Sequence, residues 1–134
     1  MRPRYADLFR RMRDPDPVAA DAAFDAVLFD RAEALPDLIE CFQKSKKDPL
    51  LRFLCVQLLG FSESAAALPT LLEALEDKSP MVRAEACRSL EDLKHPDSVA
   101  PLEARLSDVD EDVRHAAAEA LANMGRPVAE EEAG

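Results

Sequence analysis

The sequence of 134 residues contains only three glycines, no tryptophan and few aromatic residues of any kind (5%). Three scattered glycines cannot form the glycine-rich loop that binds phosphate groups, and so few aromatic side chains do not provide a stacking surface for nucleic acid bases. No apolar run is long enough to cross a bilayer, and no apolar signal-peptide segment follows the N-terminus. No Ser-His-Asp or Cys-His-Asn motif is present either, so we expect no enzymatic activity and no cofactor.

Cysteine is also scarce, with Cys41, Cys55 and Cys87 far apart in the sequence. An odd and widely spaced set does not predict a disulfide framework, and a zinc site needs paired ligands a few residues apart. His95 and His115 do not pair with any of the cysteines. We therefore expect reduced thiols in the core of a cytoplasmic protein, and no metal site.

The charge balance is acidic, with 17 basic and 27 acidic residues and a net charge of −10. Because contacts with phosphate groups require a basic surface, this balance argues against nucleic acid binding. The charge is also uneven, since residues 2–13 hold five arginines and the acidic residues 130–132 lie near the other end. Hydrophobic residues make up 48% of the chain, which is enough for a packed core.

An internal repeat of 31 residues is the strongest signal in the sequence. Arg52, Arg83 and Arg114 are separated by 31 positions each, and each follows an aliphatic residue. The same interval separates Leu59, Leu90 and Leu121, then Leu71 and Leu102, Leu75 and Leu106, and Asp77 and Asp108. The repeat continues upstream at an offset of 33, where residues 35–39 match residues 68–72. Such a fixed interval is typical of repeat architectures.

Within each repeat the apolar residues have helical spacing, as in Val82, Ala86, Leu90 and Leu93. No segment alternates as a strand does, and the prolines fall near the predicted helix starts. We therefore predict an all-α fold in which each repeat is a pair of helices. A leading helix is expected at about 4–13, first helices at about 17–30, 49–60, 80–93 and 110–124, and second helices at about 33–45, 65–77 and 97–107.

These repeats resemble the HEAT-like repeats. Residues 108–125 are similar to the first helix of such a repeat, residues 78–86 are a second copy, and residues 49–52 are a weaker third copy. The closest subtype is the short bacterial form first described in phycobilisome lyases. The resemblance implies a right-handed α-α superhelix of about three and a half helical hairpins. The chain would form one domain, with residues 1–13 as a leading or capping helix, 14–125 as repeats and 126–134 as a flexible acidic tail.

The resemblance also implies a ladder of aspartate and arginine between successive repeats, with the aspartate six positions before the arginine. Asp77 precedes Arg83 by that interval, and Asp108 precedes Arg114 in the same way. Lys46 occupies the corresponding aspartate position of the preceding repeat, so the pattern is not continued there. We interpret the four matching residues as structural and not catalytic.

The function that this architecture favours is a non-enzymatic module for protein–protein interaction. The resemblance places the second helices on the concave face, which is the expected binding surface for a protein or peptide partner. Polar positions there form a mainly acidic strip that favours a basic partner. The candidate contact residues are Asp37, Glu40, Lys44, Thr70, Glu73, Glu76, Glu103 and Arg105. An ordinary solvated helix surface is the alternative interpretation of these positions.

Two other functions follow from the resemblance alone. The repeat subtype suggests a lyase-like or chaperone-like subunit that acts on a bilin-carrying protein, although the low aromatic content does not indicate a tetrapyrrole pocket. HEAT-like solenoids can also wrap DNA, which the net charge of −10 opposes.

The two ends of the repeat array leave alternatives open. At the N-terminal end, residues 4–13 combine arginines with the apolar stripe of Tyr5, Leu8, Phe9 and Met12. This pattern predicts a helix that caps the first repeat or, with more assumptions, a basic helix that contacts anionic lipid.

At the C-terminal end the last repeat lacks a second helix. Leu121, Met124 and Val128 are therefore candidates for an exposed patch. Such a patch would permit homodimerisation, docking of a partner, or folding back of the tail.

Overall fold

The computed structural model describes residues 1–126, and every regular element in that part of the chain is a helix, which confirms the all-α prediction. The helices are α1 (Pro3–Arg11), α2 (Pro17–Phe29), α3 (Arg31–Lys44), α4 (Pro49–Phe61), α5 (Leu68–Ala74), α6 (Pro80–Leu93), α7 (Val99–Ala104) and α8 (Glu111–Asn123). Short 3-10 turns precede α5 and lie on both sides of α7, at Ala65–Ala67, Pro96–Ser98 and Arg105–Ser107.

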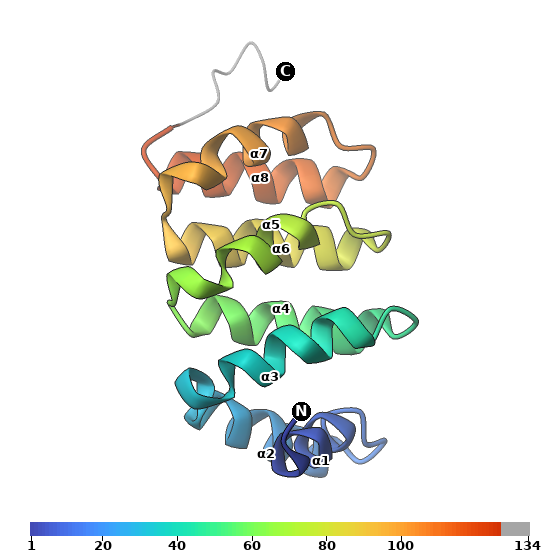
Figure 1. Cartoon of the computed structure of the whole chain (residues 1–134). Coiled ribbons are helices and arrows are strands. Elements are labelled where there is room, and N and C mark those ends of the chain that lie inside the picture. The colour runs from blue at the N-terminus through green and yellow to red at the C-terminus, as the bar shows by residue number, and fades with distance from the viewer. Residues whose placement is uncertain (127–134) are drawn as a thin grey trace.

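The helices stack in two layers, as Figure 1 shows. We call α2, α4, α6 and α8 the first-helix layer, and α1, α3, α5 and α7 the second-helix layer. The most extensive contacts join α4 to α6 and α6 to α8 within the first-helix layer, and further contacts join each second helix to the first helix that follows it. Since α1 contacts both α2 and α3, it occupies the place in the second-helix layer that precedes α3.

The observed helix boundaries match the predicted first helices closely, whereas the second helices differ from prediction. The expected helices at 65–77 and 97–107 are each divided by 3-10 turns. Proline lacks the N–H that an α-helix interior needs, so Pro69 lies in the first turn of α5 and a tighter turn precedes it. In contrast, α3 runs unbroken with Pro36 inside it, and Asp30 alone separates it from α2.

The predicted apolar stripes meet in one core between the two layers. Its largest fully buried side chains include Val27, Leu38, Phe42, Val56, Leu58, Leu59, Leu71, Leu75, Leu90, Leu102 and Leu121. Helix α1 adds Tyr5, Phe9 and Met12, whose side chains are 1%, 3% and 4% exposed. Because this stripe is inside the protein, α1 packs as part of the stack.

A left-handed residue ends each of the last three first helices. Glu63, Lys94 and Gly125 follow α4, α6 and α8 at intervals of 31 residues, with φ angles of 54°, 53° and 79°. A left-handed residue is a common helix C-cap, and glycine adopts it without the steric cost that a side chain adds. The same turn therefore recurs in three repeats, although only one of them has glycine there.

Gly60 permits the close approach of α4 and α6. A Cβ atom at this position would lie 2.5 Å from Ser89 Oγ and 3.0 Å from Ser89 Cα. The Ser89 hydroxyl donates to the carbonyl oxygen of Val56 at 3.0 Å, so the serine side chain is held against α4. The two helices are in contact at a point where one of them has no side chain.

We expect Gly60→Ala to lower the free energy of unfolding by about 1–3 kcal/mol, the usual effect of overpacking. This is the net loss expected after the gain of roughly 1 kcal/mol that alanine brings to a helix interior. Urea unfolding followed by circular dichroism measures the change. An unchanged or higher midpoint would mean that α4 and α6 separate without cost.

Lys94→Gly should raise the free energy of unfolding by about 1 kcal/mol, because it removes the strain of a side chain in the left-handed region. The matched control is Arg88→Gly in the exposed interior of α6, which should lower it by about 1 kcal/mol. If both glycines destabilise the protein equally, the left-handed turn at Lys94 is not the conformation in solution.

Candidate protein-binding surface

Buried pairs of arginine and aspartate connect successive repeats. Arg83 on α6 donates from Nε and Nη2 to the Asp108 carboxylate, with both N···O distances at 3.0 Å. Arg52 on α4 pairs in the same way with Asp77, where the distance from Nε is 2.8 Å. The Asp108 and Asp77 side chains are only 3% and 6% exposed.

The partners in this ladder differ from those that the resemblance implied. The aspartate six positions before an arginine contacts it through its backbone carbonyl, as Asp77 does with Arg83 at 2.8 Å. The ion pair instead joins each arginine to the aspartate 25 positions later. Arg52 therefore takes part, even though Lys46 precedes it by six positions. Sequence spacing identified Asp77, Arg83 and Asp108 but not Arg52, because each ion pair spans a whole hairpin.

Asp108 is held in its charged form. Burial alone would raise the pKa of its carboxyl group, but hydrogen bonds from Arg83 and from the backbone N–H of Asp110 outweigh burial and lower it below the usual value. Arg105 adds a second cation, with Nη1 at 3.3 Å from Asp108 Oδ2. Arg105 therefore contributes to the ladder, although we expected it on the binding surface.

Four of the eight expected contact residues are exposed on the second-helix layer: Lys44, Glu73, Glu76 and Glu103. Glu73 lies on α5, Glu76 follows that helix, and Glu103 lies on α7. We call these three glutamates the acidic strip. None of them forms an ion pair with a basic residue in the described part of the chain. The strip is thus an accessible set of carboxylates on two neighbouring second helices.

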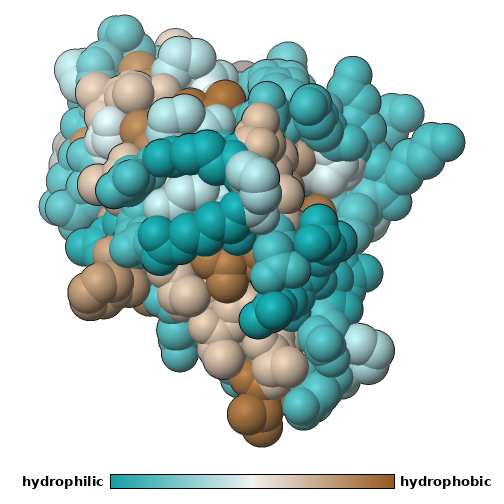
Figure 2. All heavy atoms as spheres, turned by 60° about the horizontal axis from the view of Figure 1, so that its bottom comes forward, coloured by the Kyte–Doolittle hydropathy of each residue, from teal (hydrophilic) through white to brown (hydrophobic). Residues whose placement is uncertain are grey.

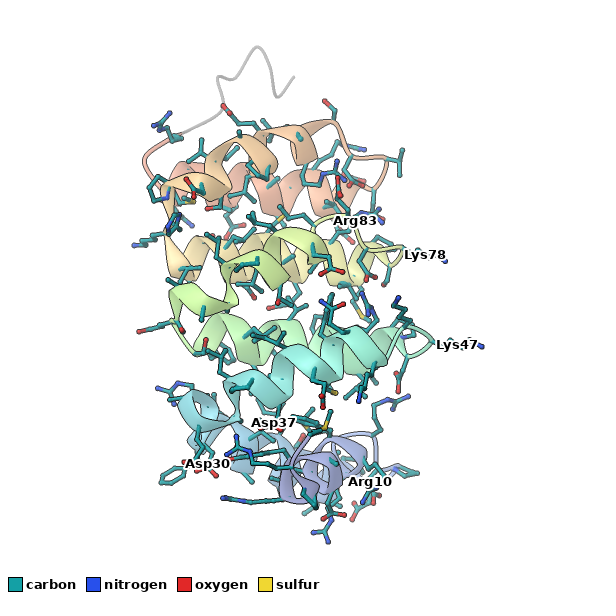
Figure 3. The ribbon with its side chains drawn as sticks, in the orientation of Figure 1. Arg10, Asp30, Asp37, Lys47, Lys78 and Arg83 are labelled. Atoms are coloured by element: carbon teal, nitrogen blue, oxygen red, sulfur yellow. The ribbon has the colours of Figure 1, made fainter. Side chains whose placement is uncertain are left out.

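Two of the expected contact residues, Asp37 and Thr70, are each only 5% exposed, so the expectation that they face a partner is corrected. Asp37 accepts hydrogen bonds from the Arg2 backbone N–H at 3.0 Å and from Arg2 Nη2 at 2.6 Å. Burial opposes its ionisation, yet the bonds from Arg2 lower its pKa. Figure 3 places Asp37 at the side of α3 that faces α1, where it joins these helices.

Glu40 is half-buried and already has cationic neighbours. Its Oε2 lies 2.9 Å from the Met1 amino nitrogen, and its Oε1 lies 3.8 Å from Lys44 Nζ. The hydrogen bond with the amino group lowers the pKa of Glu40. Glu73 on the next second helix accepts a hydrogen bond from Gln43 at 2.8 Å, which leaves its charge unneutralised. The two glutamates occupy equivalent places but have different electrostatic surroundings.

The arginines of residues 2–13 are all paired with carboxylates of the fold. Arg2 pairs with Asp37 and Glu33, Arg4 with Asp30, Arg10 and Arg11 with Asp7, and Arg13 with Asp48. The pairs of Arg2, Arg4 and Arg13 attach the N-terminal segment to the repeats, whereas Arg10 and Arg11 pair with Asp7 within α1 itself. Sequence reasoning identified the basic segment, but not its partners, because they lie up to 35 positions away.

The expected exposed patch at the C-terminal end does not form as predicted. Leu121 is only 1% exposed and belongs to the core, while Met124 is half-buried. Val128 and the acidic tail lie outside the described residues. Leu121 is buried because α8 turns its apolar stripe toward α6 and α7.

The three cysteines lie inside the fold. Cys41, Cys55 and Cys87 are free and buried, and burial raises the pKa of the Cys87 thiol to about 12. No group of three His, Cys, Asp or Glu side chains suited to a metal ion occurs within residues 1–126. In the same part of the chain, no helix has both the length and the apolar character to cross a membrane.

Comparison with protein families agrees with the stacked helical pairs. The family model described as HEAT repeats matches residues 68–131. This is a HEAT-like repeat protein. A comparison with curated proteins finds no match. Within the described residues, the matched segment of this HEAT-like protein contains α5 to α8. This segment carries the acidic strip and the ion pair between Arg83 and Asp108.

We expect Asp108→Asn to lower the free energy of unfolding at neutral pH by about 3 kcal/mol, because it leaves the buried Arg83 without its counter-charge. The Asp108 pKa is lower in the folded state than in the unfolded one, so its contribution is present above the unfolded pKa and is lost as pH falls through the folded pKa. Urea unfolding at a series of pH values measures both effects. A difference from wild type that persists unchanged at the lowest pH would contradict this electrostatic origin.

Proposed function

We propose that this HEAT-like protein is a non-enzymatic interaction module that binds a basic protein or peptide partner on its second-helix layer. HEAT repeats generally mediate protein–protein interaction, which supports the class of function. We further propose that the two layers form a short right-handed superhelix with the second-helix layer on its concave side. The module would act in the cytoplasm as an adaptor or scaffold, where its three thiols remain reduced.

The observation that carries the proposal is the contrast in charge along the second-helix layer. Asp7, Asp37 and Glu40, at the α1 and α3 end, all have cationic partners. The acidic strip on α5 and α7 has none in residues 1–126. Since no basic residue in this part of the chain neutralises these carboxylates, their charge is available to a partner.

Binding would rely on a preformed surface. The helices of a solenoid are already ordered, so little conformational entropy is lost on the protein side. Unpaired carboxylates attract lysine and arginine side chains and speed the encounter, an effect that added salt screens. A hollow beside the strip, lined by Glu76, Arg105, Ser107 and Val109 among others, would receive a side chain of the partner.

A charge reversal on the strip tests this function. Glu73→Lys with Glu76→Lys should weaken the binding of basic peptides, selected from a synthetic library by wild-type protein, by about tenfold or more. The affinity of the wild type should also fall as salt is raised. Fluorescence anisotropy measures the binding, and circular dichroism checks that the variant remains folded.

The matched control changes the same net charge on the first-helix layer. Glu111→Lys with Glu119→Lys alters two exposed residues of α8 and should leave the affinity within about twofold. Equal losses in the two variants would mean that only the total charge matters. No loss in either would show that the acidic strip is not the binding surface.

A further inference from the structure

The N-terminal end of the stack has an aspartate, Asp14, that resembles the ladder aspartates but has no arginine of a preceding repeat beside it. In the ladder, Asp77 and Asp108 each accept a hydrogen bond from the backbone N–H two positions later, at 3.0 and 2.9 Å. Asp14 accepts from the Asp16 N–H in the same way, at 2.9 Å. Each of the three aspartates lies three positions before its first helix begins. Asp14 therefore has the local geometry of a ladder aspartate, but it is exposed.

The C-terminal end of the stack has an arginine, Arg114, that resembles the ladder arginines but forms no ion pair with residues 1–126. Arg114 donates from Nη1 to the Asp108 carbonyl oxygen at 2.8 Å, as Arg83 does to Asp77. Arg83 then pairs with the aspartate of the next repeat, whereas Arg114 is exposed and forms no ion pair with residues 1–126. One end of the stack presents an arginine and the other end presents an aspartate.

The apolar residues at the two ends also correspond. Within the stack, Asn123 of α8 donates to Glu91 of α6 at 3.0 Å, which shows that these two positions meet at a junction between repeats. Counted from the first residue of each helix, Phe29 of α2 occupies the same position as Asn123 of α8, and Ala122 of α8 occupies the same position as Glu91 of α6. Both residues are exposed, and Phe29 is 87% exposed.

A second set of contact positions within the stack also has small counterparts at the two ends. Ser89 of α6 lies against Gly60 and Val56 of α4. The residues at the equivalent positions of the two ends are Ala26 on α2, and Ala122 and Ala118 on α8. Small side chains at these positions permit helices to approach as closely as α4 and α6 do. Figure 2, which brings the N-terminal end forward, shows apolar surface exposed there between hydrophilic side chains.

The order of the layers is also continuous from one end to the other. The described helices begin with α1 in the second-helix layer and finish with α8 in the first-helix layer (Figure 1). A second copy placed beyond α8 would therefore extend both layers, with its α1 next to α7 and its α2 next to α8.

We propose that the protein associates head to tail, with the α2 end of one copy stacked on the α8 end of another. Asp14 of one copy pairs with Arg114 of the other, and Phe29 packs over Ala122. Such a contact joins unlike surfaces, so it can extend to further copies. A symmetric contact between two α2 helices would instead bring Asp21 and Asp25 against their own copies. The net charge of −10 opposes association at low salt, but screening at physiological ionic strength reduces that repulsion.

Sedimentation velocity of the full chain at physiological salt tests the proposal. The wild type should show a mass that rises above 14.8 kDa as concentration increases. Asp14→Arg alone and Arg114→Asp alone should each weaken association by about tenfold or more, because like charges then meet at the junction. An equimolar mixture of the two variants should regain association, since each junction between unlike copies again joins an arginine to an aspartate.

Lys47→Asp is the matched control, because it makes the same change in charge as Arg114→Asp on an exposed loop in the middle of the stack. It should associate as the wild type does. A wild type that stays at 14.8 kDa up to millimolar concentration overturns the proposal, as does a mixture that stays monomeric. If Arg114→Asp strengthens association, Arg114 does not pair with Asp14 of another copy, and the proposal is again wrong.

Discussion

The buried ion pair between an arginine of one first helix and the aspartate before the next one determines how the repeats follow each other. Arg83 and Asp108 form this link at one junction, and Arg52 and Asp77 form it at the preceding one. Each aspartate also accepts a backbone N–H in the loop that leads into its helix, so one carboxylate joins two repeats and shapes the turn. The close contact at Gly60 depends on this register, since it requires α4 and α6 to meet at one position.

The two ends of the second-helix layer use their polar residues differently. At the α1 and α3 end, carboxylates such as Asp37 neutralise the arginines of residues 2–13, and the charges hold the fold together. On α5 and α7 the carboxylates of the acidic strip remain without cationic partners among the described residues. A short stack of repeats thus combines an internally neutralised end with an end whose charge faces solvent. This division is the physical basis for expecting a basic partner.

The ends of a repeat stack differ from its interior because each repeat contacts only its neighbours. Interior positions such as Ser89 and Cys87 are covered on both sides, whereas Ala122 and Phe29 are exposed at the two ends. At the α4–α6 and α6–α8 junctions both ladder partners are present, whereas each end of the stack has a single one. The single ladder residues at the two ends have opposite charges, and the apolar residues near them are compatible in size. The two ends of this small protein therefore differ chemically from its interior.

The sequence alone determined the helical class, the 31-residue interval and the positions of most first helices, because apolar spacing directly reports which side of a helix is buried. It also indicated Glu73, Glu76 and Glu103 as exposed, and Arg83 and Asp108 as structural. Only the tertiary structure decided that Asp37 and Thr70 are buried, that Leu121 is covered, and that Arg52 reaches Asp77. The partner of Asp37 is 35 positions away in the sequence, and that of Arg52 is 25 positions away. Local periodicity describes one helix at a time, whereas the burial and pairing of a polar side chain depend on the helices that pack around it.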